Sequence, residues 1–331
     1  MDDPAPPSLA LASKDRRTGL IVFGVFEILL GAFCALLIPM MLIGQKIAAK
    51  YGHGPNPSVL PAIIIYAAIA ITFLTLGIGS CRARRWARTL LLCLGWIGLC
   101  VGAFSIPLAW VALGSLDAQL AAQGRQMPAG GLMIVKIFAA ATSFIIYVVI
   151  PGCLVLFYRR ADVRATCERL DPIPRWTDRC PVPVLALCVF KTSCLIALLG
   201  ALPFYANAFP LMGTILQGWL AHILWIAICA FMIYSILGFY RLNRTVWRIS
   251  LVVIAILAVS YSLTYYRIGL MEYYRLAGLP EDQLAQLARS PLMSNSTFLL
   301  WIMGTSTVAY FGAVILVGRY FPKTTGRPAA A

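Results

Sequence analysis

The stretch Cys81-Arg82-Ala83-Arg84-Arg85-Trp86-Ala87-Arg88 separates two long apolar runs. A similar stretch, Tyr240-Arg241-Leu242-Asn243-Arg244-Thr245-Val246-Trp247-Arg248, separates two more. Each is a short segment rich in arginine, with a tryptophan just before the next apolar run. Short loops with this much positive charge stay on the cytoplasmic side of a membrane. We call the two stretches hinge 1 (81–88) and hinge 2 (240–248), and they predict a membrane protein of defined orientation.

The composition of the 331-residue chain agrees with a membrane protein. Hydrophobic residues make up 61% of it and charged residues 12%, whereas a soluble domain is about half apolar and about a quarter charged. A core cannot hide this excess, so lipid must solvate much of the surface. The formal net charge of +15 is also a feature of nucleic-acid-binding proteins. Here the arginines lie in loops between apolar runs, where membrane topology already explains them, and we expect no nucleic-acid partner.

Eight apolar runs are long enough to cross a bilayer. Each continues for 19 or more residues, which predicts helices, because barrel strands are about half that length and alternate in polarity. Polar segments lie at 1–17 and 318–331, and an arginine- and proline-rich linker lies at 158–183. The spans are predicted near 18–43, 59–79, 89–113, 132–157, 184–206, 212–238, 249–267 and 296–317.

Lysine and arginine are distributed unevenly between the two sides of these spans. The loops on the side of both termini hold 19 of them, and the opposite loops hold 6. This bias predicts that both termini are cytoplasmic. Arginine outnumbers lysine 21 to 6, which is typical of GC-rich bacterial genomes and favours a bacterial cytoplasmic membrane. The hinge arginines that determine the topology are Arg82, Arg84, Arg85, Arg88, Arg241, Arg244 and Arg248.

Three local similarities indicate an internal repeat. The hinges are 159 residues apart, and a Gln-Leu-Ala motif recurs at a separation of 164, starting at Gln119 and Gln283. Val25-Phe26-Glu27 and Val189-Phe190-Lys191 are also 164 apart. Matches in the same topological order predict a tandem repeat of two four-helix units, 18–157 and 184–317. Because four spans is an even number, the two units run in the same direction, as a parallel repeat.

Glu27 and Lys191 are the sharpest candidates for function inside the membrane. Each lies eight or nine residues after the cytoplasmic start of its span, which is about 12–14 Å deep. A lone charge at the bilayer centre costs about 2.5–3.5 kcal/mol, so both should seek partners. One interpretation pairs them where the two halves meet. The alternative has Lys191 extend to the cytoplasmic surface while Glu27 is protonated or bonded to a hydroxyl. A coupling-ion or proton-relay role is a further hypothesis.

Two other groups of residues have both a structural and a functional interpretation. His222 is predicted about eight residues into the sixth span, as a buried, hydrogen-bonded histidine or a proton-transfer group. Five tyrosines near the end of the seventh span form an aromatic belt at the headgroup level or, alternatively, a ligand cage. Short helices at 116–124 and 280–289 are predicted to lie flat on the outer interface. The five tyrosines are Tyr261, Tyr265, Tyr266, Tyr273 and Tyr274.

The motifs of the common hydrolases and metal sites are missing from the sequence. It has two histidines, and it has no Cys-x-x-Cys, His-Glu-x-x-His, Gly-x-Ser-x-Gly or P-loop, so we expect no catalytic residues, metal or cofactor. Gly79 with Arg84-Arg85-Trp86-Ala87-Arg88 resembles a hinge pattern of small four-span membrane proteins, and this resemblance implies no activity.

The sequence therefore predicts an all-α integral membrane protein with the lipid bilayer as its main partner. Three functions stay open. The first is a non-catalytic membrane component, such as a scaffold or assembly partner of another membrane protein. The second is a small-solute or ion transporter, with a path between the repeats lined by Glu27, Lys191 and His222. A lipid-modifying enzyme ranks lowest, because the sequence lacks the paired carboxylates of that chemistry. The linker at 158–183 is expected to join the two halves, with its arginines near anionic lipid.

Overall fold

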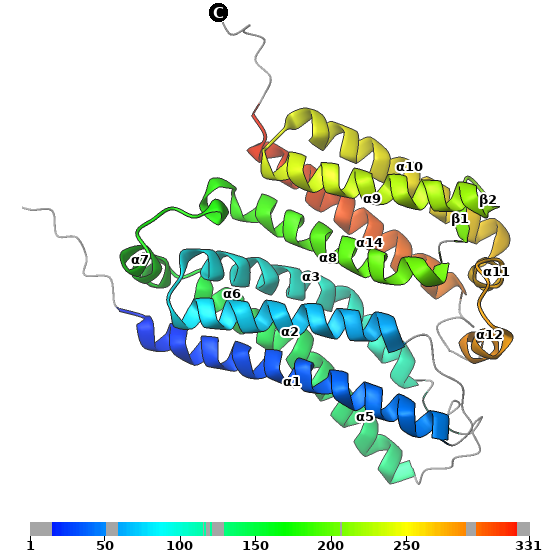
Figure 1. The fold of residues 1–331 in the computed structure, drawn as a ribbon, viewed down its shortest axis with the longest axis horizontal. Coiled ribbons are helices and arrows are strands. Elements are labelled where there is room, and N and C mark those ends of the chain that lie inside the picture. Colours follow the sequence, from blue (N-terminus) through cyan, green and yellow to red (C-terminus); the bar gives the residue numbers. More distant parts are fainter. Residues whose placement is uncertain are drawn as a thin grey trace, which may run out of the picture. The chain divides into compact units, whose positions relative to one another are not determined.

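The computed structural model describes residues 15–50, 59–114, 116, 120, 129–205, 207–288 and 296–322. These residues are almost entirely helical (Figure 1). Eight of the helices are long and apolar enough to cross a membrane. The prediction of an all-α, multi-pass architecture is therefore confirmed at this level for the described part of the chain.

The chain forms two compact units. Unit 1 consists of residues 1–95 and 153–179, and unit 2 of residues 96–152 and 180–331. The elements of unit 1 are α1 (Arg17–Lys50), α2 (Val59–Cys81), the start of α3 (Arg85–Gly114), most of α6 (Ile150–Tyr158), α7 (Ala161–Leu170) and the short helix η2 (Trp176–Arg179).

Unit 1 is organised around close contact between α1 and α2, which lie side by side (Figure 1). Gly24 and Gly77 face each other, and a Cβ added to either one would lie 2.7 Å from the carbonyl oxygen of the other. Gly31 fits in the same way against the backbone of Leu74. Small residues let two backbones approach this closely, which is how apolar helices associate in lipid.

Unit 2 contains the remaining helices and a small two-stranded sheet. Pro151 follows a π-helical turn, η1 (Ile145–Val149), which accommodates the missing proline N–H within one continuous span. The predicted close packing at Gly98 and Gly102 is confirmed, since added Cβ atoms would meet Pro151 and Tyr147 at 2.9 and 2.5 Å. The other elements of unit 2 are α5 (Ala129–Phe144), α8 (Val182–Tyr205), β1 (Ala208–Leu211), β2 (Thr214–Gln217), α9 (Trp219–Tyr240), α10 (Arg244–Ile268), α11 (Leu270–Leu276), α12 (Glu281–Ala288), α14 (Ser296–Val317) and η3 (Gly318–Tyr320).

The strands β1 and β2 correct one predicted boundary. The sixth span was expected to begin at residue 212, but an antiparallel hairpin precedes α9, with Leu211 paired to Thr214. Its turn residues Met212 and Gly213 have φ angles of 47° and 88°, as in the two-residue turns that match strand twist. The hairpin is apolar enough to resemble the start of a span, and the turn signal of Gly213 was overlooked.

Two buried hydroxyls hold this hairpin on α10. Ser260 Oγ accepts the Met212 N–H, and Thr264 Oγ1 accepts the Gly213 N–H, both at 2.9 Å. The two acceptors are four residues apart and therefore lie on the same face of the helix. The backbone groups of an apolar turn thus find partners without water.

Hinges 1 and 2 have the same backbone conformation. Ala83 and Leu242, which are 159 residues apart, have φ angles of 50° and 54°. In each hinge three N–H groups bond back to the end of the preceding helix, and the donors and acceptors also correspond at a separation of 159. The bonds are Arg82 to Ile78, Ala83 to Ser80 and Arg84 to Gly79 in hinge 1, and Arg241 to Leu237, Leu242 to Phe239 and Asn243 to Gly238 in hinge 2.

A glycine makes each hinge tight enough for the two helices to touch. A Cβ added to Gly79 would lie 2.6 Å from Ala87 Cβ, and one added to Gly238 would lie 2.5 Å from Val246 Cγ1. In both hinges the contacted side chain is eight residues after the glycine and is buried. The helices before and after each hinge therefore pack against each other at once.

We predict that Gly238→Ala lowers the free energy of unfolding by about 1–3 kcal/mol, because the new methyl group overpacks the contact with Val246. Thermal unfolding of the purified protein in detergent measures this change. Gly304→Ala and Gly312→Ala are matched controls in α14, where an added Cβ meets nothing within 4 Å. Equal unfolding temperatures for all three variants would show that the contact is not tight.

Candidate functional site

Glu27 belongs to a buried hydrogen-bonded cluster in unit 1, which we call cluster 1 (Leu20, Glu27, Ser80 and Tyr158). Tyr158 Oη lies 3.1 Å from Glu27 Oε1 and 2.6 Å from Ser80 Oγ. Ser80 donates to the Leu20 carbonyl oxygen at 3.0 Å. Each of the four residues is at most 1% exposed. The cluster joins α1, α2 and α6 through polar groups inside the apolar segments.

Aromatic rings lie beside cluster 1. The rings of Phe23 and Phe157 stack at 4.3 Å, and each lies edge-on to Tyr158. Glu27 Oε2 is buried and has no hydrogen-bond partner among the described residues. The acid group is therefore enclosed, with one oxygen bonded to a phenol and the other unbonded.

Lys191 belongs to a second buried cluster in unit 2, which we call cluster 2 (Lys191, Ser235, Phe239 and Ser250). Its ammonium group donates to Ser235 Oγ, which lies 3.0 Å from Ser250 Oγ. The same ammonium lies 3.8 Å from the centre of the Phe239 ring, where the negative face of the ring attracts a cation. Lys191 is 5% exposed, so it does not extend to the surface. Cluster 2 joins α8, α9 and α10.

The two clusters hold different groups at corresponding positions. Glu27 and Lys191 are 164 residues apart, and Leu76 and Ser235 are 159 apart. Leu76 is as deeply buried in unit 1 as Ser235 is in unit 2, so the serine is present where a buried cation needs an acceptor. Glu27 and Lys191 each have partners within their own unit. The predicted contact between them is not needed to explain their burial, and it stays a prediction.

His222 is close to the start of α9 rather than near its middle. The helix begins at Trp219, so His222 is in the first turn; it is exposed, and its Nδ1 lies 2.8 Å from the Gly218 carbonyl oxygen. The predicted depth was wrong, because the hairpin occupies the residues counted as the first two turns of the span. The hydrogen bond found for His222 is local to the helix end.

The predicted linker forms a folded cap over hinge 1. In this linker cap (161–179), Asp171 is 2% exposed, and its Oδ1 lies 2.9 Å from Arg175 Nη2 and 3.4 Å from Arg84 Nη1. The Arg85 backbone N–H donates to the other oxygen. The hydrogen bond from Arg175, with the Arg85 N–H and the nearby charge of Arg84, lowers the pKa of Asp171.

The arginines that set the predicted topology differ in their contacts. Arg85 lies 3.5 Å from Glu168 and 3.4 Å from Asp178, so it also holds the linker cap. Arg244, its counterpart in hinge 2, donates to the Phe321 carbonyl oxygen at 3.4 Å. Arg88 is half-buried, whereas the side chains of Arg82, Arg241 and Arg248 are exposed.

The tyrosines at the other end of α10 pack mainly against the hairpin. Tyr273 is 6% exposed, lies edge-on to Tyr265 and donates to the Ala208 carbonyl oxygen at 3.4 Å. Tyr266 is 79% exposed. Of the two predicted interfacial helices, α12 matches 280–289 closely, and the one at 116–124 lies largely outside the described residues.

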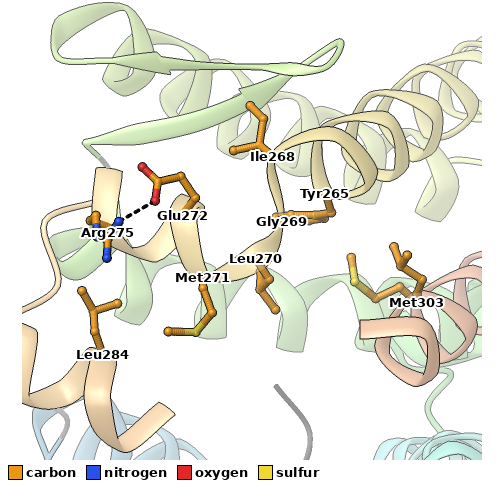
Figure 2. Close-up of a pocket in the computed structure, with 10 residues that line it drawn as sticks. Tyr265, Ile268, Gly269, Leu270, Met271, Glu272, Arg275, Leu284 and Met303 are labelled. Carbon is orange, nitrogen blue, oxygen red and sulfur yellow. Dashed lines mark hydrogen bonds and ion pairs between the residues drawn. The ribbon is translucent and has the colours of Figure 1, made fainter. Parts of the chain in front are cut away.

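A pocket of about 370 Å³ lies beside these tyrosines, between the end of α10, α11, α12 and α14 (Figure 2). Apolar side chains line most of it, together with the paired side chains of Glu272 and Arg275. Sequence reasoning did not identify this pocket, because its walls come from four separate segments.

Sequence reasoning also missed the partners of Glu27 and Lys191. Ser80, Tyr158, Ser235 and Ser250 are single polar residues inside apolar runs, and that is the signal that could have found them. Within the residues that the structure describes, no group of three or more His, Cys, Asp or Glu side chains is arranged to hold a metal ion. Comparisons of the chain with models of protein families, with curated proteins and with solved structures found no match.

We predict that acid weakens the linker cap through Asp171. Its pKa is depressed in the folded state, so its stabilising effect is complete above the unfolded value and disappears as the pH falls through the lower folded value. The unfolding temperature should therefore be steady down to about pH 5 and fall below about pH 4.

Asp171→Asn should lower the unfolding temperature at pH 7 and flatten this acid dependence. Asp162→Asn is the matched control in the same cap, because its ion pair with Arg16 is long, at 3.6 Å, and partly exposed. Identical acid profiles for Asp171→Asn and the unmodified protein would contradict the assignment.

Proposed function

We propose that the protein is a non-catalytic component of a bacterial cytoplasmic membrane, acting as a scaffold or assembly partner for other membrane proteins. The observation that carries this proposal is the use of the intramembrane polar groups. Clusters 1 and 2 each bind three helices together, which is the structural use of polar residues in membrane bundles. A rigid bundle with a folded, charged cap is suited to hold a partner in place.

The proposed architecture is a parallel repeat of two four-helix units with both termini in the cytoplasm. The corresponding hydrogen bonds and φ angles of the two hinges support the repeat. So does helix packing at Gly24, which approaches the Gly77 carbonyl oxygen, while Cys188 Sγ donates to that of Ile236 at 3.7 Å. These two contacts correspond at the separations of 164 and 159. The unequal distribution of lysine and arginine supports the orientation.

The linker cap is the surface that we expect a cytoplasmic partner to use. Exposed arginines alternate with acids along α7, as in Arg164 and Glu168, which pair at 2.8 Å. The cap is held to hinge 1 by Asp171 and Arg85, so its charges occupy fixed positions. Fixed charges of both signs favour a specific protein contact over general attraction.

A fluorescent protein fused after Ala331 tests the scaffold proposal. We expect fluorescence in cells, which requires a cytoplasmic C terminus, and a stoichiometric partner after purification in mild detergent. Reversing the paired charges on α7, with Arg164→Glu and Glu168→Arg, should preserve the fold but reduce recovery of the partner. A protein that purifies alone under mild conditions and supports solute flux in liposomes would refute the scaffold role.

A second function, proton-coupled transport, is favoured by the count of protons in cluster 1. Three oxygen–oxygen contacts link Leu20, Ser80, Tyr158 and Glu27. The two hydroxyl groups supply one proton each, whereas a carbonyl and an ionised carboxylate supply none. A proton on Glu27 provides the third hydrogen bond, so the second candidate treats Glu27 as a neutral acid that binds and releases a proton. The titratable groups around it are Tyr158 and Cys81.

Infrared spectroscopy at pH 7 tests the neutral acid directly. We expect a protonated carboxyl band in the unmodified protein and its loss in Glu27→Gln, because the amide retains the hydrogen bond but not the acid. Asp171→Asn is the matched control and should retain the band, since Asp171 is ionised among arginines. Transport further requires a pH-dependent flux in liposomes that Glu27→Gln abolishes. A band without flux leaves Glu27 as a structural acid and excludes the transporter.

A further inference from the structure

The pocket beside α11 lies where two spans end. Tyr265 and Ile268 contribute from the last turn of α10, and Leu300 and Met303 from the first part of α14 (Figure 2). The ends of transmembrane helices lie at the level of the lipid headgroups. The pocket is therefore placed at the boundary between acyl chains and water.

A single backbone break forms one wall of this pocket. Gly269 ends α10 with a φ angle of 84° and starts α11 one residue later. Residues with side chains rarely adopt this conformation, so glycine is the residue suited to the turn. The break turns the chain sideways, and Leu270, Met271 and Glu272 then line the pocket (Figure 2).

One part of the pocket suits an apolar chain. Leu270, Met271, Leu284 and Met303 approach it from three different helices (Figure 2). Two of these four residues are methionines, whose flexible thioethers adapt to the shape of a bound chain. The volume of about 370 Å³ is at the lower end of the range for ligand sites and suits part of a lipid rather than a large molecule.

The other part carries one charge of each sign. Arg275 Nη1 donates to Glu272 Oε2 at 3.0 Å, and both side chains are largely exposed. This bond uses one of five guanidinium N–H groups and one of two carboxylate oxygens. The pair can therefore also bind an anion at Arg275 and a cation at Glu272.

We propose that this pocket binds one phospholipid whose headgroup carries a phosphate and a primary amine. The phosphate binds Arg275, the ammonium binds Glu272, and the start of an acyl chain lies against the two methionines. The proposal combines three independent observations: the position at the ends of the spans, the apolar lining and the paired charges. It does not depend on the scaffold role.

Thermal unfolding in detergent, with defined lipids added to delipidated protein, tests this site. Phosphatidylethanolamine should raise the unfolding temperature, because it binds the native state. Phosphatidylglycerol should do so less, because it lacks the amine. Glu272→Gln and Arg275→Gln should each weaken the effect of phosphatidylethanolamine about tenfold in concentration, as expected for a lost charge-assisted bond.

Two further variants distinguish the pocket from general lipid solvation. Met271→Trp should fill the pocket and remove the response while the protein still folds. Arg267→Gln is the matched control, because Arg267 is exposed on the last turn of α10 and does not line the pocket. Equal responses to the two lipids, or an unchanged response in Met271→Trp and Arg275→Gln, would overturn the proposal.

Discussion

The structure depends on one constraint: a polar group inside an apolar segment must find its partner within the protein, because lipid offers none. Glu27 finds a phenol and Lys191 finds a serine, each on a neighbouring helix of its own unit. The same rule places Ser260 and Thr264 beneath the hairpin turn. Each such contact fixes which helices are neighbours, so the few polar residues of the spans determine much of the packing.

Outside the apolar segments, arginine has a similar organising role. Positive charge in a short loop selects the side of the membrane, but Arg84 and Arg85 also bind the acids of the linker cap. The cap thereby joins a segment that follows α6 to the turn between α2 and α3. Topology and tertiary structure are thus encoded by the same residues, which explains why hinge 1 contains more charge than its position alone requires.

Prediction from sequence succeeded where a pattern is long and failed where contacts are made by single residues. The bounds of α14 match the predicted span, because continuous apolarity over five turns has few alternatives. The start of the sixth span was wrong, since the hairpin at 208–217 is as apolar as a helix end. The depth of His222 was wrong for the same reason. Burial of Glu27 and Lys191 was expected from the cost of exposed charge in lipid, whereas their partners were not.

The sequence by itself determined the membrane architecture and its eight candidate spans, because transfer of apolar surface into lipid is a sum over many residues. It also indicated that Glu27 and Lys191 are interior, since a charge facing lipid is costly. Only the tertiary structure decided that Tyr158 and Ser235 are their partners, that Asp171 joins the linker to hinge 1, and that a pocket lies between α11 and α14. Such contacts depend on the distance between single side chains far apart in the chain, and periodicity and composition carry no record of that distance.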